Sequence, residues 1–166
     1  MSELLSDKSL YLFAYGSCMS QQSLTKTLGD DSRRYFVSSA TLAHHRLCFN
    51  YTSLNEPVCC ANISPTLGST VQGALYRLPE QLMTLIDRRE GVHLQRYKRQ
   101  WVSVTQADGQ PVIAITYFAR ATQRSEAAPS ERYRQLLVAG AQDAGVSYSY
   151  TINLLRHMAQ LPDREC

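Results

Sequence analysis

The segment of residues 10–19, Leu-Tyr-Leu-Phe-Ala-Tyr-Gly-Ser-Cys-Met, constrains the fold of this chain more than any other. Its apolar and aromatic first part, residues 10–15, predicts a β-strand. The run stops at Gly16 and Ser17, and the polar residues 20–27 predict the start of a helix. A strand, a glycine turn and a helix start leave several backbone N–H groups unpaired and directed at one point. Such a turn suits a carboxylate or an oxyanion, although an ordinary strand-to-helix connection fits the spacing equally well.

The length and composition of the chain predict one globular domain. With 166 residues, 44% of them apolar and 19% charged, we expect a single domain over residues 1–166, with a flexible N-terminus over residues 1–9. No stretch approaches the roughly 18 apolar residues of a membrane span, and the N-terminus lacks the pattern of a secretion signal. We therefore expect no membrane partner.

The basic residues do not form a strong nucleic-acid footprint. The net charge is only +3, and most Lys and Arg residues are scattered along the chain. One denser group is predicted to form a solvated face: Arg88, Arg89, Arg96, Lys98 and Arg99. We therefore expect no nucleic-acid partner.

The cysteines indicate reduced thiols and a cytoplasmic protein. Their number is odd and two of them are adjacent, which argues against a disulfide framework; they are Cys18, Cys48, Cys59, Cys60 and Cys166. The spacing of the residues that could be imagined as a zinc cluster matches no common site; these are His44, His45, Cys48, Cys59 and Cys60. We predict core or surface roles for them and no bound metal.

Strand signals dominate the rest of the first two thirds of the chain. Residues 35–51 predict one or two strands, and residues 58–63 and 70–78 predict one strand each. Gly73 within the last of these predicts a bulge or a close approach to the backbone. Two further runs, 97–106 and 112–119, flank Ala-Asp-Gly-Gln and predict a hairpin. About six or seven short strands with helices between and after them predict an α+β domain with a curled or closed, mostly antiparallel sheet.

The helix predicted after Pro79 carries an acid where its apolar stripe calls for a core residue. The stripe includes Leu82 and Ile86, and extending it by one turn reaches Glu90, directly before the helix-ending Gly91. Burial, the negative end of the helix dipole and the acid Asp87 all act to raise the pKa of Glu90. A raised pKa suits a general base that works near neutrality. Arg89 fits the stripe nearly as well, so an exposed, frayed helix end remains an alternative.

Other polar side chains are weaker candidates for a site. Ser17 is not part of a Gly-x-Ser-x-Gly motif, and the four histidines show no recognisable partner spacing. Four tyrosines stand where a predicted element points inward or ends: Tyr15, Tyr97, Tyr117 and Tyr133. Each either lines a site or belongs to the core with a satisfied hydroxyl.

Three motifs taken together resemble the γ-glutamylcyclotransferase family. They are Phe-Ala-Tyr-Gly-Ser at 13–17, Gly73 in its strand, and Asp-x-x-Glu-Gly-Val at 87–92. The later order of a tyrosine at 97, a strand ending at Tyr117, and Tyr133 before Gly140 also agrees, so the resemblance covers about residues 10–155. It implies a small, closed or nearly closed β-barrel flanked by helices, with a cavity at the barrel mouth.

The resemblance also implies an enzyme that converts γ-glutamyl amino acids or amines to 5-oxoproline. Glu90 takes the catalytic position, Tyr133 a substrate-contacting one, and Tyr117 shapes the pocket. The implied cradle for the glutamyl unit is the backbone of Leu12, Phe13, Ala14, Tyr15, Gly16 and Ser17. The substrate's own α-amine attacks its γ-carbonyl, so this lyase or acyltransferase chemistry needs no covalent intermediate, metal or cofactor. Family members commonly read Tyr-Gly-Ser-Asn-Leu, whereas this chain has Cys18 and Met19 after Ser17.

Several alternatives remain open at the level of sequence. The leaving group could be an amino acid, an amine, an antibiotic precursor or, as in glutathione metabolism, the rest of glutathione. The chain could also be a non-catalytic ligand-binding or regulatory module of the same fold. Relatives include monomers and homodimers, and the sequence favours neither.

Overall fold

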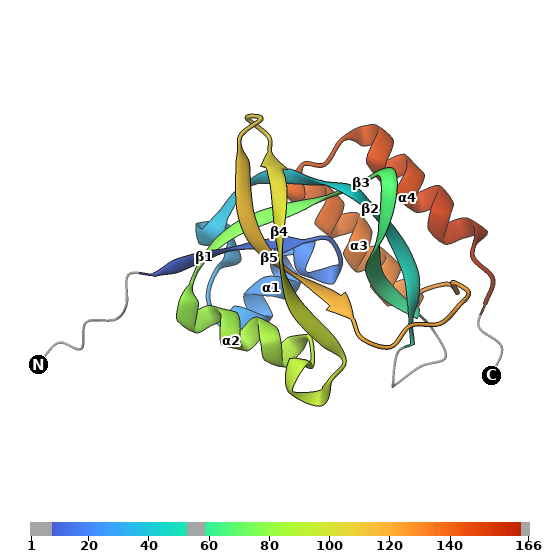
Figure 1. The fold of residues 1–166 in the computed structure, drawn as a ribbon, viewed down its shortest axis with the longest axis horizontal. Helices are drawn as coiled ribbons and strands as arrows, with labels where there is room; N and C mark the ends of the chain where they lie inside the picture. The colour runs from blue at the N-terminus through green and yellow to red at the C-terminus, as the bar shows by residue number, and fades with distance from the viewer. Residues whose placement is uncertain (1–7, 53–58, 164–166) are drawn as a thin grey trace, which may run out of the picture.

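Five strands close into a barrel within residues 8–52 and 59–163, the part of the chain that the computed structural model describes. Their order around the barrel is β1-β3-β2-β4-β5 (Figure 1). All neighbouring strands pair antiparallel except β1 and β5, which close the barrel in parallel through Leu12 and Ile115. The strands are β1 (Ser9–Ala14), β2 (Phe36–Thr52), β3 (Cys59–Pro79), β4 (Tyr97–Gln106) and β5 (Pro111–Ala119). The expected α+β barrel, mostly antiparallel and flanked by helices, is confirmed.

The expected count of six or seven strands is wrong for the described residues, because two long strands replace several short ones. The runs predicted at 58–63 and 70–78 belong to one strand, β3, although residue 58 itself lies outside the described residues. β2 pairs with β3 along almost its whole length, with register shifts between Ala43 and His45 and between Cys48 and Tyr51. Such irregularities bend and twist a strand. Residues 64–69, Ser-Pro-Thr-Leu-Gly-Ser, thus continue the strand rather than break it.

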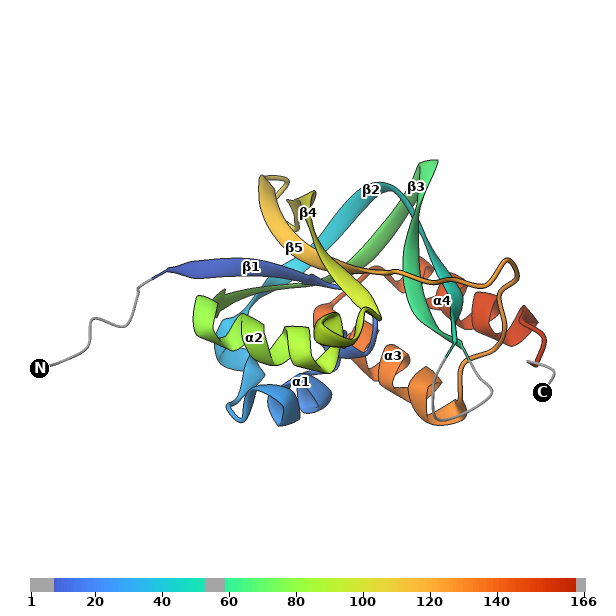
Figure 2. The same ribbon diagram turned by 60° about the horizontal axis from the view of Figure 1, so that its bottom comes forward.

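Four helices flank the barrel: α1 (Gln21–Leu28), α2 (Glu80–Arg89), α3 (Glu131–Ala144) and α4 (Tyr148–Gln160). Serine side chains cap the N-termini of α1, α3 and α4, and left-handed glycines end α1 and α3. Figure 2 shows α1, α2 and α3 on the same side of the barrel. None of the helices in the described part of the chain is long and apolar enough to cross a membrane.

The start of the chain departs from the expected flexible segment over residues 1–9. Ser9 is already the first residue of β1 and pairs with Pro79 at the end of β3. Residues 1–7 lie outside the described residues.

Helix α3 packs directly against the turn that follows β1. Leu137, Gly140 and Ala141 of α3 are buried. A Cβ atom added at Gly140 would lie 2.6 Å from the Cβ of Met19 and 2.7 Å from the backbone nitrogen of Ser20. Only a residue without a side chain permits this contact. Gly140 thus places α3 behind the turn at residues 16–19.

Gly73 confirms the close backbone approach expected from the sequence. A Cβ atom at this position would overlap the carbonyl oxygen of Ala14, at the C-terminal end of β1. Gly73 pairs with Ala40 of β2, and the next residue of β3, Ala74, pairs with Ala14. The missing side chain lets β1 lie close against β3 just before the Gly16 turn.

We expect Gly73→Ala to destabilise the fold by about 1–3 kcal/mol, the usual cost of overpacking a well-packed interior. The added methyl group meets backbone, which cannot rotate away as a side chain can. Chemical denaturation of both proteins measures the difference in the free energy of unfolding. A loss below about 0.5 kcal/mol, typical of surface positions, would contradict this close approach.

Candidate active site

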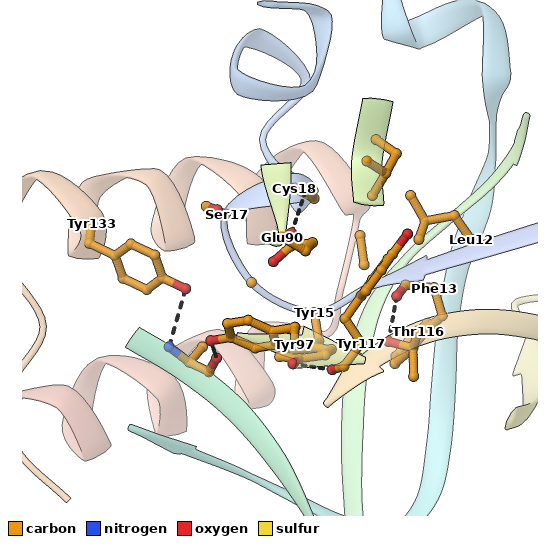
Figure 3. A pocket seen from close by; sticks show the side chains of 14 residues that line it. Leu12, Phe13, Tyr15, Ser17, Cys18, Glu90, Tyr97, Thr116, Tyr117 and Tyr133 are labelled. Atoms are coloured by element: carbon orange, nitrogen blue, oxygen red, sulfur yellow. Dashed lines mark hydrogen bonds between the residues drawn. The ribbon is translucent and has the colours of Figure 1, made fainter. Parts of the chain in front are cut away.

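One cavity opens where β1 ends, between the barrel and the helices α2 and α3 (Figure 3). Its volume is about 40 Å³. Every residue expected at the site lies in its wall: Leu12, Phe13, Ala14, Tyr15, Gly16, Ser17, Glu90, Tyr117 and Tyr133. The remaining wall residues are Cys18, Ala61, Ile86, Tyr97 and Thr116.

The turn after β1 presents free backbone donors to this cavity. Residues Ser17–Met19 form one 3₁₀ turn, in which the N–H of Met19 donates to the Gly16 carbonyl at 3.0 Å. The N–H groups of Ser17 and Cys18 find no acceptor within the described chain. They belong to this turn and not to α1, which starts later with Ser20 as its N-cap. Two of the predicted unpaired donors therefore exist among the described residues, and they lie before α1 rather than in it.

Glu90 terminates α2 and carries its carboxylate into the cavity. Its N–H still donates to the Ile86 carbonyl at 2.9 Å, so its backbone continues the helix by one residue. Burial raises the pKa of Glu90, while the neighbouring Arg89 guanidinium and the Cys18 thiol oppose that rise. Its carboxyl is therefore easier to protonate than that of an exposed glutamate.

Asp87 does not contribute to this shift, contrary to our expectation. Its Oδ1 accepts hydrogen bonds from Arg99 Nε and from the Tyr117 hydroxyl, both at 2.6 Å. The Arg99 charge compensates the Asp87 carboxylate, and the raised pKa of Glu90 has burial as its main cause. Asp87 instead holds the Tyr117 ring in place at the edge of the cavity.

Cys18 contacts Glu90 directly. Its Sγ donates to Glu90 Oε1 at 3.5 Å, and Figure 3 shows the two side chains facing each other. Burial raises the pKa of the Cys18 thiol to about 12, so near neutral pH it carries its proton and acts as a donor. The two residues stand 72 positions apart in the sequence, and no local signal predicts their contact.

Arg89 is not part of a solvated basic face, which corrects our expectation for this residue. Its guanidinium donates to Ser17, Ser23 and Thr27 over distances of 2.8–3.1 Å. Its neighbour Arg88 is exposed, as expected. The choice between Arg89 and Glu90 for the buried stripe is thus resolved by the end of the helix, where Arg89 faces α1 and Glu90 faces the cavity.

The tyrosines of the cavity are tied to backbone groups or to Asp87. Tyr15 donates to the Tyr117 carbonyl at 2.6 Å, and Tyr97 donates to the Ala61 carbonyl at 2.8 Å. Tyr133 differs, because its oxygen accepts a hydrogen bond from the Ala61 N–H at 3.2 Å. Its hydroxyl proton remains uncommitted to any group that the structure describes. Burial raises the pKa of Tyr133, so this proton stays on the oxygen.

Thr116 is a wall residue that sequence reasoning missed. Its hydroxyl donates to the Phe13 carbonyl at 2.8 Å, linking β5 to β1 beside their parallel pairing. No signal in the sequence indicates that these two strands are neighbours.

The histidines and the other described cysteines lie outside the cavity wall. His157 contacts Glu126 Oε1 at 2.9 Å, and His44 Nδ1 accepts from the Gly68 N–H at 3.2 Å. Among residues 8–52 and 59–163, no three His, Cys, Asp or Glu side chains form a group that could hold a metal ion. Cys166 lies outside these ranges.

Comparisons with known proteins show the family and the fold of this chain. A model of the AIG2-like family matches residues 70–154. YkqA of Bacillus subtilis (strain 168), named as a candidate gamma-glutamylcyclotransferase, is 31% identical over 153 residues, covering 92% of this chain and 53% of its own length. Its crystal structure superposes with a TM-score of 0.86 at 30% identity, over 95% of this chain and 57% of YkqA. This chain therefore spans about half the length of that relative.

Two further solved structures share the fold. One, described as a gamma-glutamyl cyclotransferase, has a TM-score of 0.81 at 21% identity, over 95% of this chain and 91% of its own. The other, an uncharacterized protein from Homo sapiens, has a TM-score of 0.80 at 22% identity, over 96% of this chain and 92% of its own. At such identities these structures establish the common fold.

We expect Cys18→Ala to raise the pKa of Glu90 further, because the thiol hydrogen bond stabilises the ionised carboxylate. Cys18→Ser retains a hydrogen-bond donor and should raise the pKa of Glu90 less than Cys18→Ala does. An NMR titration of the Glu90 side-chain carboxyl carbon measures the pKa in each variant. Cys48→Ala is the matched control, since this buried thiol bonds to the Asn62 carbonyl instead. A Glu90 pKa equal to that of the wild type in Cys18→Ala would show that the contact has no electrostatic effect.

Proposed function

The chain belongs to the AIG2-like, γ-glutamylcyclotransferase-like family, and on this premise we propose that it catalyses the cyclisation of a γ-glutamyl compound. The products are 5-oxoproline and a free amino acid or amine. The substrate is a small molecule, and the reaction uses no cofactor. We place the protein in the cytoplasm, as one domain over residues 1–166, acting as a monomer or a homodimer.

The observation that carries this proposal is the position of Glu90. Its partly buried carboxylate, with a raised pKa, shares one small cavity with the free N–H groups of Ser17 and Cys18. A carboxyl group with a raised pKa thus lies in the same cavity as donors for a negative charge. Apolar and aromatic residues such as Leu12, Phe13 and Ile86 form part of the surrounding wall.

The proposed reaction is an intramolecular attack. The α-amine of the glutamyl unit attacks its own γ-carbonyl carbon, a new C–N bond closes the five-membered ring, and the original amide C–N bond breaks. Because both reacting groups belong to one molecule, the enzyme needs only to hold the chain in its folded conformation. No covalent bond to the protein forms.

Glu90 moves the proton in this scheme. Its carboxylate takes a proton from the attacking amine and then delivers it to the departing nitrogen, so the side chain ends in its starting state. An ordinary glutamate is too weak a base for the first transfer, and the pKa raised by burial improves it. The uncommitted proton of Tyr133 provides a further donor to the substrate from the opposite wall.

The backbone at the end of β1 supplies the binding cradle. Residues 12–17 line the cavity, and the parallel neighbour β5 holds them through the Thr116 hydrogen bond. The N–H groups of Ser17 and Cys18 then bind the glutamyl carboxylate or the oxyanion that develops on the γ-carbonyl. A donor in such a position is typically worth about 3–4 kcal/mol in the transition state.

We expect Glu90→Gln to reduce 5-oxoproline release by at least about a hundredfold, the lower range for loss of a general acid–base group. The amide keeps the shape of the side chain and cannot carry the proton. The assay is 5-oxoproline formation from a panel of γ-glutamyl amino acids, γ-glutamyl amines and glutathione. Glu131→Gln, which changes an exposed acid on α3, is the matched control and should retain full activity.

The same panel separates the alternatives. Near-normal turnover by Glu90→Gln removes Glu90 from its assigned role. No 5-oxoproline from any compound with the wild-type protein favours a non-catalytic ligand-binding or regulatory module. The compound with the highest kcat/KM identifies the class of leaving group.

We expect Tyr133→Phe to raise KM several-fold with little change in kcat, because one hydroxyl contact is lost while Glu90 is untouched. The Ala61 N–H also loses its acceptor, so thermal unfolding is measured in parallel. An unchanged KM would place the Tyr133 hydroxyl in the core rather than at the substrate.

A further inference from the structure

The side chain of Arg89 connects the end of α2 to α1 and to the turn at Ser17. Nη1 donates to the Ser23 carbonyl at 3.1 Å and to Thr27 Oγ1 at 2.8 Å, both on α1. Nη2 donates to Ser23 Oγ and to Ser17 Oγ, each at 2.8 Å. The last residue of α2 is thus bonded both to α1 and to the turn that lines the cavity.

The hydrogen bond from Arg89 decides how the Ser17 hydroxyl can be used. Because Ser17 Oγ accepts from a guanidinium, its own proton points away from Arg89. No acceptor within the described residues takes that proton, and Ser17 lies in the cavity wall. A hydroxyl that accepts from a cation is also a stronger donor, because hydrogen bonds in a chain polarise one another. Both the O–H and the N–H of Ser17 are therefore available as donors at the cavity wall.

The charge of Arg89 has no carboxylate bonded to it in the described part of the chain. All four of its hydrogen bonds go to neutral oxygens. A partly buried cation without a salt bridge is costly unless an anion lies near it, and Glu90 interacts with Arg89 through its charge alone. Glu90, the acid next to it in sequence, faces the cavity and bonds Cys18 instead. The site thus holds one positive charge behind the turn that presents the free donors.

We infer that Arg89 is a positioning residue that, through Ser17, strengthens the binding of the substrate's α-carboxylate at the turn of residues 17–18. The carboxylate accepts the Ser17 hydroxyl and the N–H groups of Ser17 and Cys18, with the guanidinium behind them. This inference rests on the proposed function for the identity of the anion. The contacts of Arg89 with α1 and Ser17 are independent of it.

The test compares Arg89→Gln, Ser17→Ala and the double variant with the wild type, on the γ-glutamyl compound that the wild type turns over best. Each variant is assayed at its own optimal pH, because losing Arg89 also raises the pKa of Glu90. We expect each single variant to raise KM about tenfold or more, the usual effect of losing a hydrogen bond to a charged group, with kcat within about threefold. The double variant should resemble Ser17→Ala alone.

Two further measurements separate this role from a purely structural one. The inhibition constant of 5-oxoproline, which carries the same carboxylate, should rise with KM in Arg89→Gln. The control Arg88→Gln removes the same charge from an exposed position on the same helix and should change neither constant. Thermal unfolding of all variants shows whether the change in KM occurs in folded protein.

Several outcomes would overturn the inference. An unchanged KM in Arg89→Gln, a fall in kcat alone, or effects that multiply in the double variant would each show that Arg89 does not act through Ser17 on the carboxylate. If Arg88→Gln and Arg89→Gln raised KM equally, the effect of Arg89 would come from net charge and not from its contact with Ser17. A wild type that releases no 5-oxoproline overturns the proposed function as well, which distinguishes the two failures.

Discussion

The site depends on the placement of the C-terminal end of β1 between two other strands. β1 pairs with β3 over all six of its residues and closes the barrel by a parallel pairing with β5. Gly73 permits the close approach on one side, and the Thr116 hydrogen bond to the Phe13 carbonyl holds the other. Gly140 brings α3 against the turn that follows. The chain therefore leaves the barrel in a defined conformation, and the residues with unpaired N–H groups line the same cavity as Glu90.

The second constraint is the burial of an acid at a helix end. Glu90 breaks the rule that an apolar stripe continues into the core, and burial of its carboxylate is unfavourable for the ionised form. The thiol of Cys18 and the charge of Arg89 offset part of that cost without neutralising the acid through an ion pair. A carboxyl group with a raised pKa is the better proton shuttle near neutral pH. The burial of Glu90 thus both costs folding free energy and raises the pKa on which the proposed chemistry depends.

Cys18 and Arg89 are the side chains that contact Glu90 and Ser17 of the cavity. Cys18 stands where the family commonly has asparagine and contributes a single donor to Glu90 instead of an amide. Arg89 holds Ser17 from the other side of the turn. Cys18 lies in the cavity wall and bonds to Glu90, whereas Arg89 lies behind the wall and bonds to Ser17. In the proposed reaction Glu90 moves the proton and the backbone binds the substrate, whereas these two neighbours adjust the electrostatics of the cavity.

The sequence by itself determined the local elements and most of the wall of the site. The strand, glycine turn and helix start near Gly16, the hairpin of β4 and β5, and the helix ending before Gly91 follow from signals within a few residues. Only the tertiary structure decided that two long strands replace several short ones, that β1 meets β5, and that Cys18 faces Glu90. Backbone preferences act over one or two turns of chain, whereas a contact between residues 72 positions apart arises only when separate elements pack. For that reason the acid could be found in the sequence, and the groups that tune it could not.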